Sequence, residues 1–155
     1  MAQKKINSVI DRAYKLRGKA VTKPQPEIRV HAWLETREGL LFGVGRAELL
    51  DKIDELGSLR KAAEEMCMSY RAAWGKIKKT EEILGFKLIE KERGNKIGFR
   101  LTEAGKALKT NYRDWYRAIE TEALRKAREL FPWTMTIPEK KPAHRGMPEE
   151  AGNKC

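Results

Sequence analysis

The sequence predicts a mainly helical α+β fold, a winged helix-turn-helix with an N-terminal β-hairpin and a long C-terminal helix. Two short helical patterns meet at a brief turn within residues 57–85, which is the spacing of a helix-turn-helix. A basic strand–turn–strand pattern follows at residues 86–101. A proline-free helical pattern then covers residues 102–131. These observations define the centre of the predicted fold.

Residues 1–27 predict a basic arm and linker. Within residues 1–20 the apolar residues recur three and four apart, which indicates a short helix: Ile6, Val9, Ile10, Ala13 and Leu16. The stretch "TKPQPE" follows it, and its two prolines disfavour regular structure. The arm carries seven Lys or Arg and two Asp or Glu, a large share of the chain's net charge of +11. Such an excess favours a polyanionic partner, most often nucleic acid.

Residues 28–42 predict a β-hairpin. Apolar residues alternate with polar ones from Ile28 to Leu34, "TREG" is a turn signal, and "LLF" forms the returning strand. This pattern places His31 on the polar face of a strand. A helix then extends from "GVGR" to Gly57, which suits a left-handed helix end. The glycines of "GVGR" lack the third glycine of a dinucleotide fingerprint and the lysine of a P-loop, so we interpret them as a hairpin-to-helix turn.

Ser58 is a predicted N-cap for the helix "LRKAAEEM". The pair Ala62-Ala63 is small, so a neighbouring helix axis can approach closely. After a turn at "CM", Ser69 caps a second helix that ends at Gly85. In a helix-turn-helix the N-terminal residues of the second helix meet base edges in the major groove of DNA. The adjacent acids of each helix, at 64–65 and 81–82, are interpreted as solvated charge.

The second helix therefore predicts a DNA-contacting surface. Its candidate contacts are Ser69, Tyr70, Arg71, Trp74, Lys76, Lys78 and Lys79. Tyr70 and Arg71 are the candidates for base contact, and Arg71 suits a guanine. The lysines suit phosphates.

The hairpin after the second helix predicts a wing. Its strands are expected at Lys87–Glu92 and Ile97–Leu101, with "RGNK" as a tight turn. A basic hairpin in this place can reach phosphates or the adjacent minor groove. The wing residues that we expect to do so are Lys91, Arg93 and Lys96.

Residues 102–131 predict a long helix, with Thr102 as its cap. Its apolar and aromatic stripe is longer than a small domain needs, so we expect it to form a homodimer interface through Leu108, Tyr112, Trp115 and Ile119. The alternative is a helix that packs only on its own subunit. Residues 132–155 contain four prolines and no periodicity, which predicts a disordered tail.

At this point the sequence resembles a known family. The segments "GSLRKAAEEMCMSYRAAWGKI" and "LTEAGKAL" look like the winged helix-turn-helix of ModE-type molybdate-responsive regulators, and more distantly like the DNA-binding domain of LysR-type regulators. The resemblance covers roughly residues 28–125 and implies a dimeric regulator that binds double-stranded DNA. It does not imply oxyanion sensing, because a molybdate-binding domain needs well over a hundred residues beyond those.

Other function classes find less support in the residues. The two cysteines and two histidines show no metal-ligand spacing, and no cofactor, catalytic set or membrane-spanning run is visible, so we expect a cytoplasmic protein that is not an enzyme. Cys67 lies in the turn before the second helix. It is expected to be a buried small hydrophobe, although a redox- or ligand-responsive switch remains an alternative. An architectural or protein-interaction winged helix is another, and any small-molecule effector is unknown.

Overall fold

The computed structural model describes residues 2–16, 24–92 and 98–138. The chain divides into two compact units, and each is described by itself. The first, the helix-turn-helix unit, consists of residues 32–115 together with 142–155, which lie outside the described residues. The second, the strand-pairing unit, consists of residues 1–31 and 116–141.

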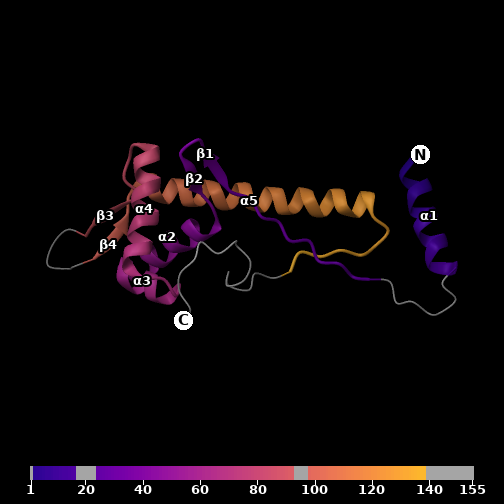
Figure 1. Ribbon diagram of the computed structural model, residues 1–155, viewed down its shortest axis with the longest axis horizontal. Coiled ribbons are helices and arrows are strands. Elements are labelled where there is room, and N and C mark those ends of the chain that lie inside the picture. Colours follow the sequence, from indigo (N-terminus) through magenta and orange to yellow (C-terminus); the bar gives the residue numbers. More distant parts are fainter. Residues whose placement is uncertain (1, 17–23, 93–97, 139–155) are drawn as a thin grey trace. The chain divides into compact units, whose positions relative to one another are not determined.

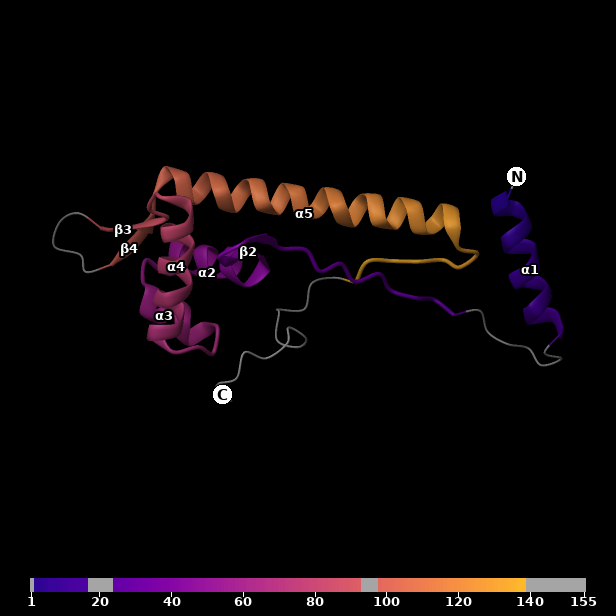
Figure 2. The same cartoon turned by 45° about the horizontal axis from the view of Figure 1, so that its top comes forward.

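The helix-turn-helix unit contains the predicted elements in the predicted order. After the hairpin of β1 (Leu34–Thr36) and β2 (Gly39–Phe42) come α2 (Val44–Leu56), α3 (Leu59–Glu65) and α4 (Tyr70–Leu84). The short wing strands β3 (Ile89–Lys91) and β4 (Phe99–Leu101) follow, and α5 (Glu103–Leu130) begins directly after them. Figures 1 and 2 show α2, α3 and α4 clustered beside the wing and the first turns of α5. The predicted fold class is confirmed.

Local chemistry explains where these helices begin and end. Ser58 and Ser69 cap α3 and α4, because each hydroxyl accepts a hydrogen bond from the backbone N–H three residues later, at 3.3 and 3.1 Å. Gly57 and Gly85 end α2 and α4 in the left-handed conformation, with φ of 62° and 76°. These predictions are confirmed, and Gly43 is the N-cap of α2, as expected for a hairpin-to-helix turn.

The core of the helix-turn-helix unit lies where the three helices cross. The small residues Ala62, Ala63 and Ala73 are almost completely buried there, which lets α3 and α4 pack closely. The largest fully buried side chains are Phe42, Leu49, Leu50, Ile53, Leu59, Ile77 and Leu88. One polar contact lies among them, since Arg46 Nε donates to Thr80 Oγ1 at 2.8 Å. The Thr80 hydroxyl in turn donates to a carbonyl oxygen, that of Leu41 at 2.9 Å, and so connects α4 to the hairpin.

The first predicted strand was too long. Pairing in the hairpin begins only at Leu34, because the backbone before it bonds elsewhere in the chain. In the strand-pairing unit, the N–H of Ile28 donates to the carbonyl of Thr136 at 2.8 Å. His31 is exposed, as predicted.

The strand-pairing unit also corrects the prediction of a disordered tail for residues 132–138. Glu27 and Thr136 form a parallel bridge, and Met135 is 4% exposed. The Tyr116 hydroxyl of α5 donates to the carbonyl of Val30. Residues 139–155 lie outside the described residues. The helix predicted in the arm is present as α1 (Ala2–Leu16).

Among the described residues, no helix combines the length and the apolar character that crossing a membrane would require.

Candidate nucleic-acid interface

The N-terminal end of α4 is exposed and basic. Arg71 and Lys79 are exposed, Tyr70 is 41% exposed, and Lys76 and Lys78 are half-buried. Ser69 already uses its hydroxyl to cap the helix, so its first role is to fix where α4 begins. Because an α-helix makes a turn about every 3.6 residues, one side of α4 carries Tyr70, Arg71, Trp74 and Lys78, whereas Lys76 and Lys79 lie away from that side.

Trp74 joins the second helix to the wing. Its ring lies parallel to that of Tyr70, with centroids 6.5 Å apart and planes 10° apart, and it also contacts Phe99 of β4 at 5.9 Å. The Lys78 ammonium lies 5.4 Å from the Trp74 ring centre, a cation–π distance. Trp74 is half-buried in these contacts, so it supports the surface as well as lining it.

Glu81 corrects the interpretation of the 81–82 acids as solvated charge. Its side chain is almost completely buried, and its carboxylate accepts hydrogen bonds from Leu88 N at 2.9 Å, Ile89 N at 3.3 Å and Lys87 Nζ at 2.8 Å. The hydrogen bond to Glu81 raises the pKa of Lys87 above its usual value. The end of α4 is thereby tied to the first strand of the wing. The apolar periodicity could have indicated this, since Glu81 lies four residues after the buried Ile77.

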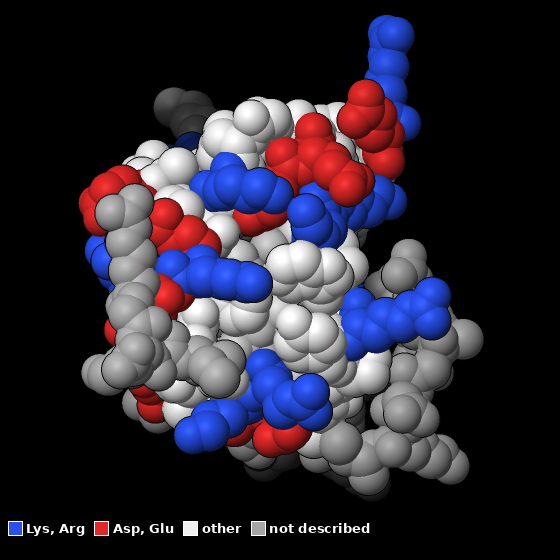
Figure 3. All heavy atoms as spheres, turned by 90° about the vertical axis from the view of Figure 1, so that its left-hand side faces the viewer, with Lys and Arg blue, Asp and Glu red and all other residues white. Residues whose placement is uncertain are grey.

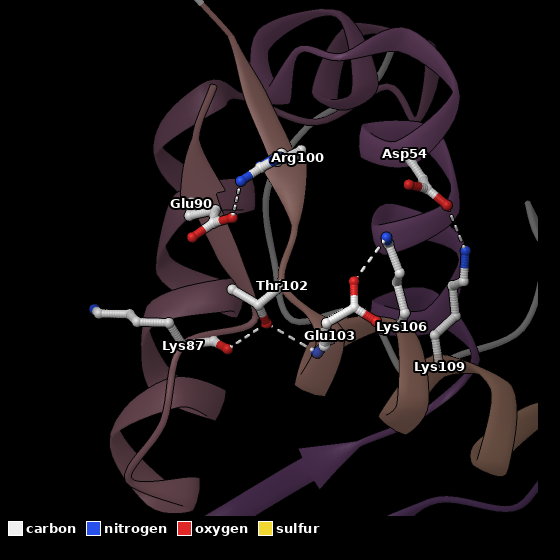
Figure 4. A network of polar contacts seen from close by, with 9 residues as sticks. Asp54, Lys87, Glu90, Arg100, Thr102, Glu103, Lys106 and Lys109 are labelled. Carbon is white, nitrogen blue, oxygen red and sulfur yellow. Dashed lines mark hydrogen bonds and ion pairs between the residues drawn. The ribbon is translucent and has the colours of Figure 1, made fainter. Parts of the chain in front are cut away.

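A second set of contacts fixes the base of the wing (Figure 4). Thr102 Oγ1 donates to the carbonyl of Lys87 at 2.7 Å and accepts from Gly105 N at 3.0 Å, which confirms Thr102 as a cap of α5. Glu90 and Arg100 form an ion pair across the two strands at 2.7 Å. Wing and α5 are thus joined through one threonine.

The tip of the wing is not part of the described structure. Both strands are shorter than predicted, and residues 93–97 lie outside the described residues. The predicted contacts Arg93 and Lys96 fall in that segment. Lys91 ends β3 and is exposed.

Charge is unevenly placed on the face that carries the wing. In Figure 3, Lys and Arg side chains lie around an uncharged central area, and Asp and Glu side chains lie beside several of them. Such an arrangement suits a polyanion that lies across the face, because cations at several points can each meet a phosphate.

Tyr112 of α5 packs against β2 of its own chain, and this corrects one predicted interface residue. Tyr112 is only 4% exposed, its ring meets Phe42 edge-on at 5.2 Å, and its hydroxyl donates to the carbonyl of Ala32 at 2.8 Å. It is therefore core of its own chain and offers no surface to a second copy. Trp115 is 39% exposed, and Leu108 and Ile119 are half-buried.

Ion pairs hold the same part of α5. Lys109 Nζ lies 3.3 Å from Asp51 and 3.0 Å from Asp54, and Arg113 also pairs with Asp51. The Lys109 side chain is 14% exposed and that of Asp51 is 22% exposed, so these charges are less screened than surface pairs. They fix the first turns of α5 against α2.

Cys67 is not the buried hydrophobe that we expected. It is exposed, and its backbone has φ of 52°, the left-handed region that glycine adopts most easily. The turn between α3 and α4 therefore takes a glycine-like conformation with a cysteine. Among the described residues, no three His, Cys, Asp or Glu side chains are arranged to hold a metal ion.

Residues 45–106 match the family model described as "Bacterial regulatory helix-turn-helix protein, lysR family". This segment is therefore similar to LysR-family helix-turn-helix domains. The match runs from α2 to the start of α5 and contains α3, α4 and the wing. No curated protein matches the chain.

Several solved structures are similar to part of this chain, at TM-scores below 0.5. The CbnR DNA-binding domain in complex with DNA is 21% identical, with 54% of this chain and 93% of that chain covered and a TM-score of 0.44. The BenM DNA-binding domain in complex with benA site 1 DNA is 21% identical. The match covers 56% of this chain and 94% of that chain, with a TM-score of 0.43. ArgP from Mycobacterium tuberculosis is 27% identical. The match covers 55% of this chain and 30% of that chain, with a TM-score of 0.40. TM-scores below 0.5 do not by themselves establish a shared fold.

Proposed function

We propose that the protein is a sequence-specific DNA-binding transcriptional regulator that acts as a homodimer in the cytoplasm. The match of residues 45–106 to a LysR-family regulatory helix-turn-helix supports DNA binding and regulation. In the proposed complex α4 enters the major groove, and the wing lies against phosphates or the adjacent minor groove. A helix-turn-helix generally reads two symmetric half-sites, which favours two copies of the chain.

The observation that carries this proposal is the exposed basic start of α4 held in a fixed position next to the wing. Ser69 fixes the first turn of the helix, and Glu81 fixes its end to β3. A rigid scaffold that presents exposed cations is what base readout requires, because base contacts depend on the register of the helix in the groove. Enzymatic function has no comparable support in the described residues.

A finer assignment, to the ModE-type branch, is also part of the proposal. Its support is the combination of motifs in this sequence: "GS" before α3, the Ala62-Ala63 pair, "SYRAAW" at the start of α4 and "LTEAG" after the wing.

The experiment that tests the function is selection from a pool of random duplex DNA, with binding then followed across salt concentrations. A palindromic motif with half-sites about one helical turn apart is the expected result. Tight, salt-sensitive binding with no enriched motif would instead identify an architectural protein that reads the DNA backbone. Absence of binding at physiological salt would overturn the proposal in favour of a protein-interaction module.

Two substitutions then separate base readout from phosphate contact. Arg71→Ala is expected to cost about 1–3 kcal/mol on the selected motif and to relax its sequence preference. Lys79→Ala is expected to weaken binding to selected and scrambled duplexes alike. If both variants lost affinity equally on both duplexes, Arg71 would not be a base-reading residue.

A further inference from the structure

A cation on the first helix of the motif lies against the aromatic side chains of the second. The guanidinium carbon of Arg60, on α3, is 5.6 Å from the centre of the Tyr70 ring on α4. Tyr70 lies parallel to Trp74, and Lys78 lies over the other ring of this pair. We call these four residues the cation–aromatic column: Arg60, Tyr70, Trp74 and Lys78. Sequence reasoning assigned no role to Arg60.

The column leaves the donors of Arg60 available. A guanidinium over an aromatic ring uses its face for the contact, whereas its N–H groups point outward in the guanidinium plane. Arg60 is exposed, and within the described part of the chain it forms no ion pair, although Glu64 lies one helical turn away on the same helix. Tyr70 therefore holds the Arg60 side chain while its hydrogen-bonding edge remains open.

We propose that Arg60 is a further phosphate-contact residue of the DNA interface and that Tyr70 is its positioning residue. The inference rests on the proposed function. The first helix of a helix-turn-helix crosses the DNA backbone beside the groove that the second helix enters. A guanidinium at that point can bind a phosphate with two parallel hydrogen bonds. Holding the side chain in advance reduces the entropy lost when it is ordered on binding.

A purely structural role for Arg60 makes a different prediction. If the contact with Tyr70 only stabilised the turn between α3 and α4, removal of Arg60 would lower the melting temperature and leave the salt dependence of DNA binding unchanged. A phosphate contact instead contributes a released counterion, so its removal changes the slope of log K against log salt concentration. The slope is therefore the deciding measurement.

The experiment compares Arg60→Ala and Arg60→Gln with Lys61→Ala, using the full chain. Lys61 is the matched control, because it is the next residue on α3, is exposed and loses the same charge, but has no aromatic contact in the described structure. Each variant is titrated with a duplex recovered from the selection and with a scrambled duplex, at several salt concentrations. Circular dichroism melting shows whether each variant is folded.

The expected result is a smaller salt slope for Arg60→Ala and for Arg60→Gln on both duplexes. Each phosphate contact contributes about 0.9 to the slope, so the proposed dimer, with one Arg60 in each copy, should lose about 1.8. Lys61→Ala should keep the wild-type slope. Arg60→Lys should keep the slope but lose affinity, because an ammonium lacks the two-pronged geometry.

Tyr70 is tested by a double-mutant cycle. Tyr70→Phe keeps the ring, so Arg60→Ala should have its full effect on affinity in that background. Tyr70→Leu removes the ring, and there the effect of Arg60→Ala should shrink. Equal effects in the two backgrounds would remove Tyr70 from the proposal as positioning residue.

The outcomes distinguish a failure of the Arg60 phosphate contact from a failure of the proposed DNA-binding function. Wild-type protein that fails to bind either duplex overturns both. Wild-type protein that binds with a steep salt slope, together with Arg60→Ala and Arg60→Gln proteins that keep that slope as Lys61→Ala does, overturns the phosphate contact alone. In that case the column is a structural brace of the helix-turn-helix.

Discussion

Glu81 is a buried acid whose charge is offset by three hydrogen bonds. Two of its donors are backbone N–H groups at the start of the wing, which would otherwise lack a partner in a buried place. The residue was missed because adjacent glutamates on a helix usually indicate a solvated face. Glu81 becomes a buried hydrogen-bond acceptor only because β3 lies against the end of α4, and the local sequence does not show that contact.

We expect Glu81→Ala to destabilise the protein by about 2–4 kcal/mol, because it leaves two buried donors unsatisfied. Glu82→Ala is the control. Its side chain is exposed, so a change within about 0.5 kcal/mol is expected. Urea denaturation followed by circular dichroism measures both. Equal stabilities for the two variants would show that the Glu81 hydrogen bonds contribute little.

Tyr116 gives a prediction about alkaline pH. Burial raises the pKa of its phenol, and the nearby Glu120 carboxylate adds to the effect. At pH values between the unfolded and the folded pKa, the folded state keeps the phenol proton and the unfolded state loses it. This contribution to stability is therefore complete below about pH 10 and declines as pH rises through the folded pKa.

For Tyr116→Phe we expect a flatter fall of stability above about pH 10. The ultraviolet titration of tyrosinate should also lose one late-ionising component, that of Tyr116. A variant titration in which the late component persists would assign the raised pKa to another tyrosine.

At the scale of elements, a glycine is required by packing in α5 but not in α4. A Cβ at Gly105 would lie 2.2 Å from the carbonyl oxygen of Leu88, so this position lets the start of α5 touch the base of the wing. A Cβ at Gly75, on the exposed side of α4, would meet nothing within 4 Å. The glycine of "LTEAG" is therefore required sterically. The fold places no such requirement on the glycine of "AWGK".

The two alanine substitutions should therefore change stability in opposite directions. Gly105→Ala is expected to destabilise by about 1–3 kcal/mol or more, since the clash is with backbone. Gly75→Ala is expected to stabilise by about 0.5–1 kcal/mol, the usual difference inside a helix. Thermal melting of both variants tests this pair. Destabilisation by Gly75→Ala would mean that the outer face of α4 is less open than described.

The elements that sequence predicted well are those specified within a few residues. Caps at Ser58 and Ser69, helix ends at Gly57 and Gly85, and apolar spacings located α2, α3 and α4 closely. The errors concern pairings between distant residues. Ile28 bonds to Thr136 across more than a hundred positions, so neither the late start of the hairpin nor the order in residues 132–138 could be read locally.

For the candidate site the same division holds. Periodicity and caps placed Tyr70 and Arg71 at the exposed start of α4, because those signals are local. Arg60 was not found, since its contact with Tyr70 depends on how α3 and α4 cross. Tyr112 was predicted to lie in the dimer interface because it belongs to the apolar stripe. Such a stripe does not show whether a second copy or the same chain packs against it, and Tyr112 packs against Phe42 of the same chain.

At the scale of the whole molecule, the proposed homodimer now depends on three residues of the predicted stripe: Leu108, Trp115 and Ile119. We expect Trp115→Lys to shift the mass in solution from dimer to monomer, because it places a charge in the proposed interface. Sedimentation equilibrium measures the mass. Tyr112→Phe is the control and should leave the mass unchanged, since Tyr112 is buried in its own chain. A Trp115→Lys protein that stayed dimeric would exclude this face of α5.

The carboxylate of Glu81 has a consequence for hydrogen exchange. Amides at the start of a two-stranded ribbon three residues long normally exchange quickly, because so short a ribbon frays. The amides of Leu88 and Ile89 instead donate to Glu81 on α4, so they can exchange only when the ribbon separates from the end of that helix. Their exchange rates therefore measure how firmly α4 and the wing hold together. Slower exchange on a bound duplex would show that the two elements act as one body.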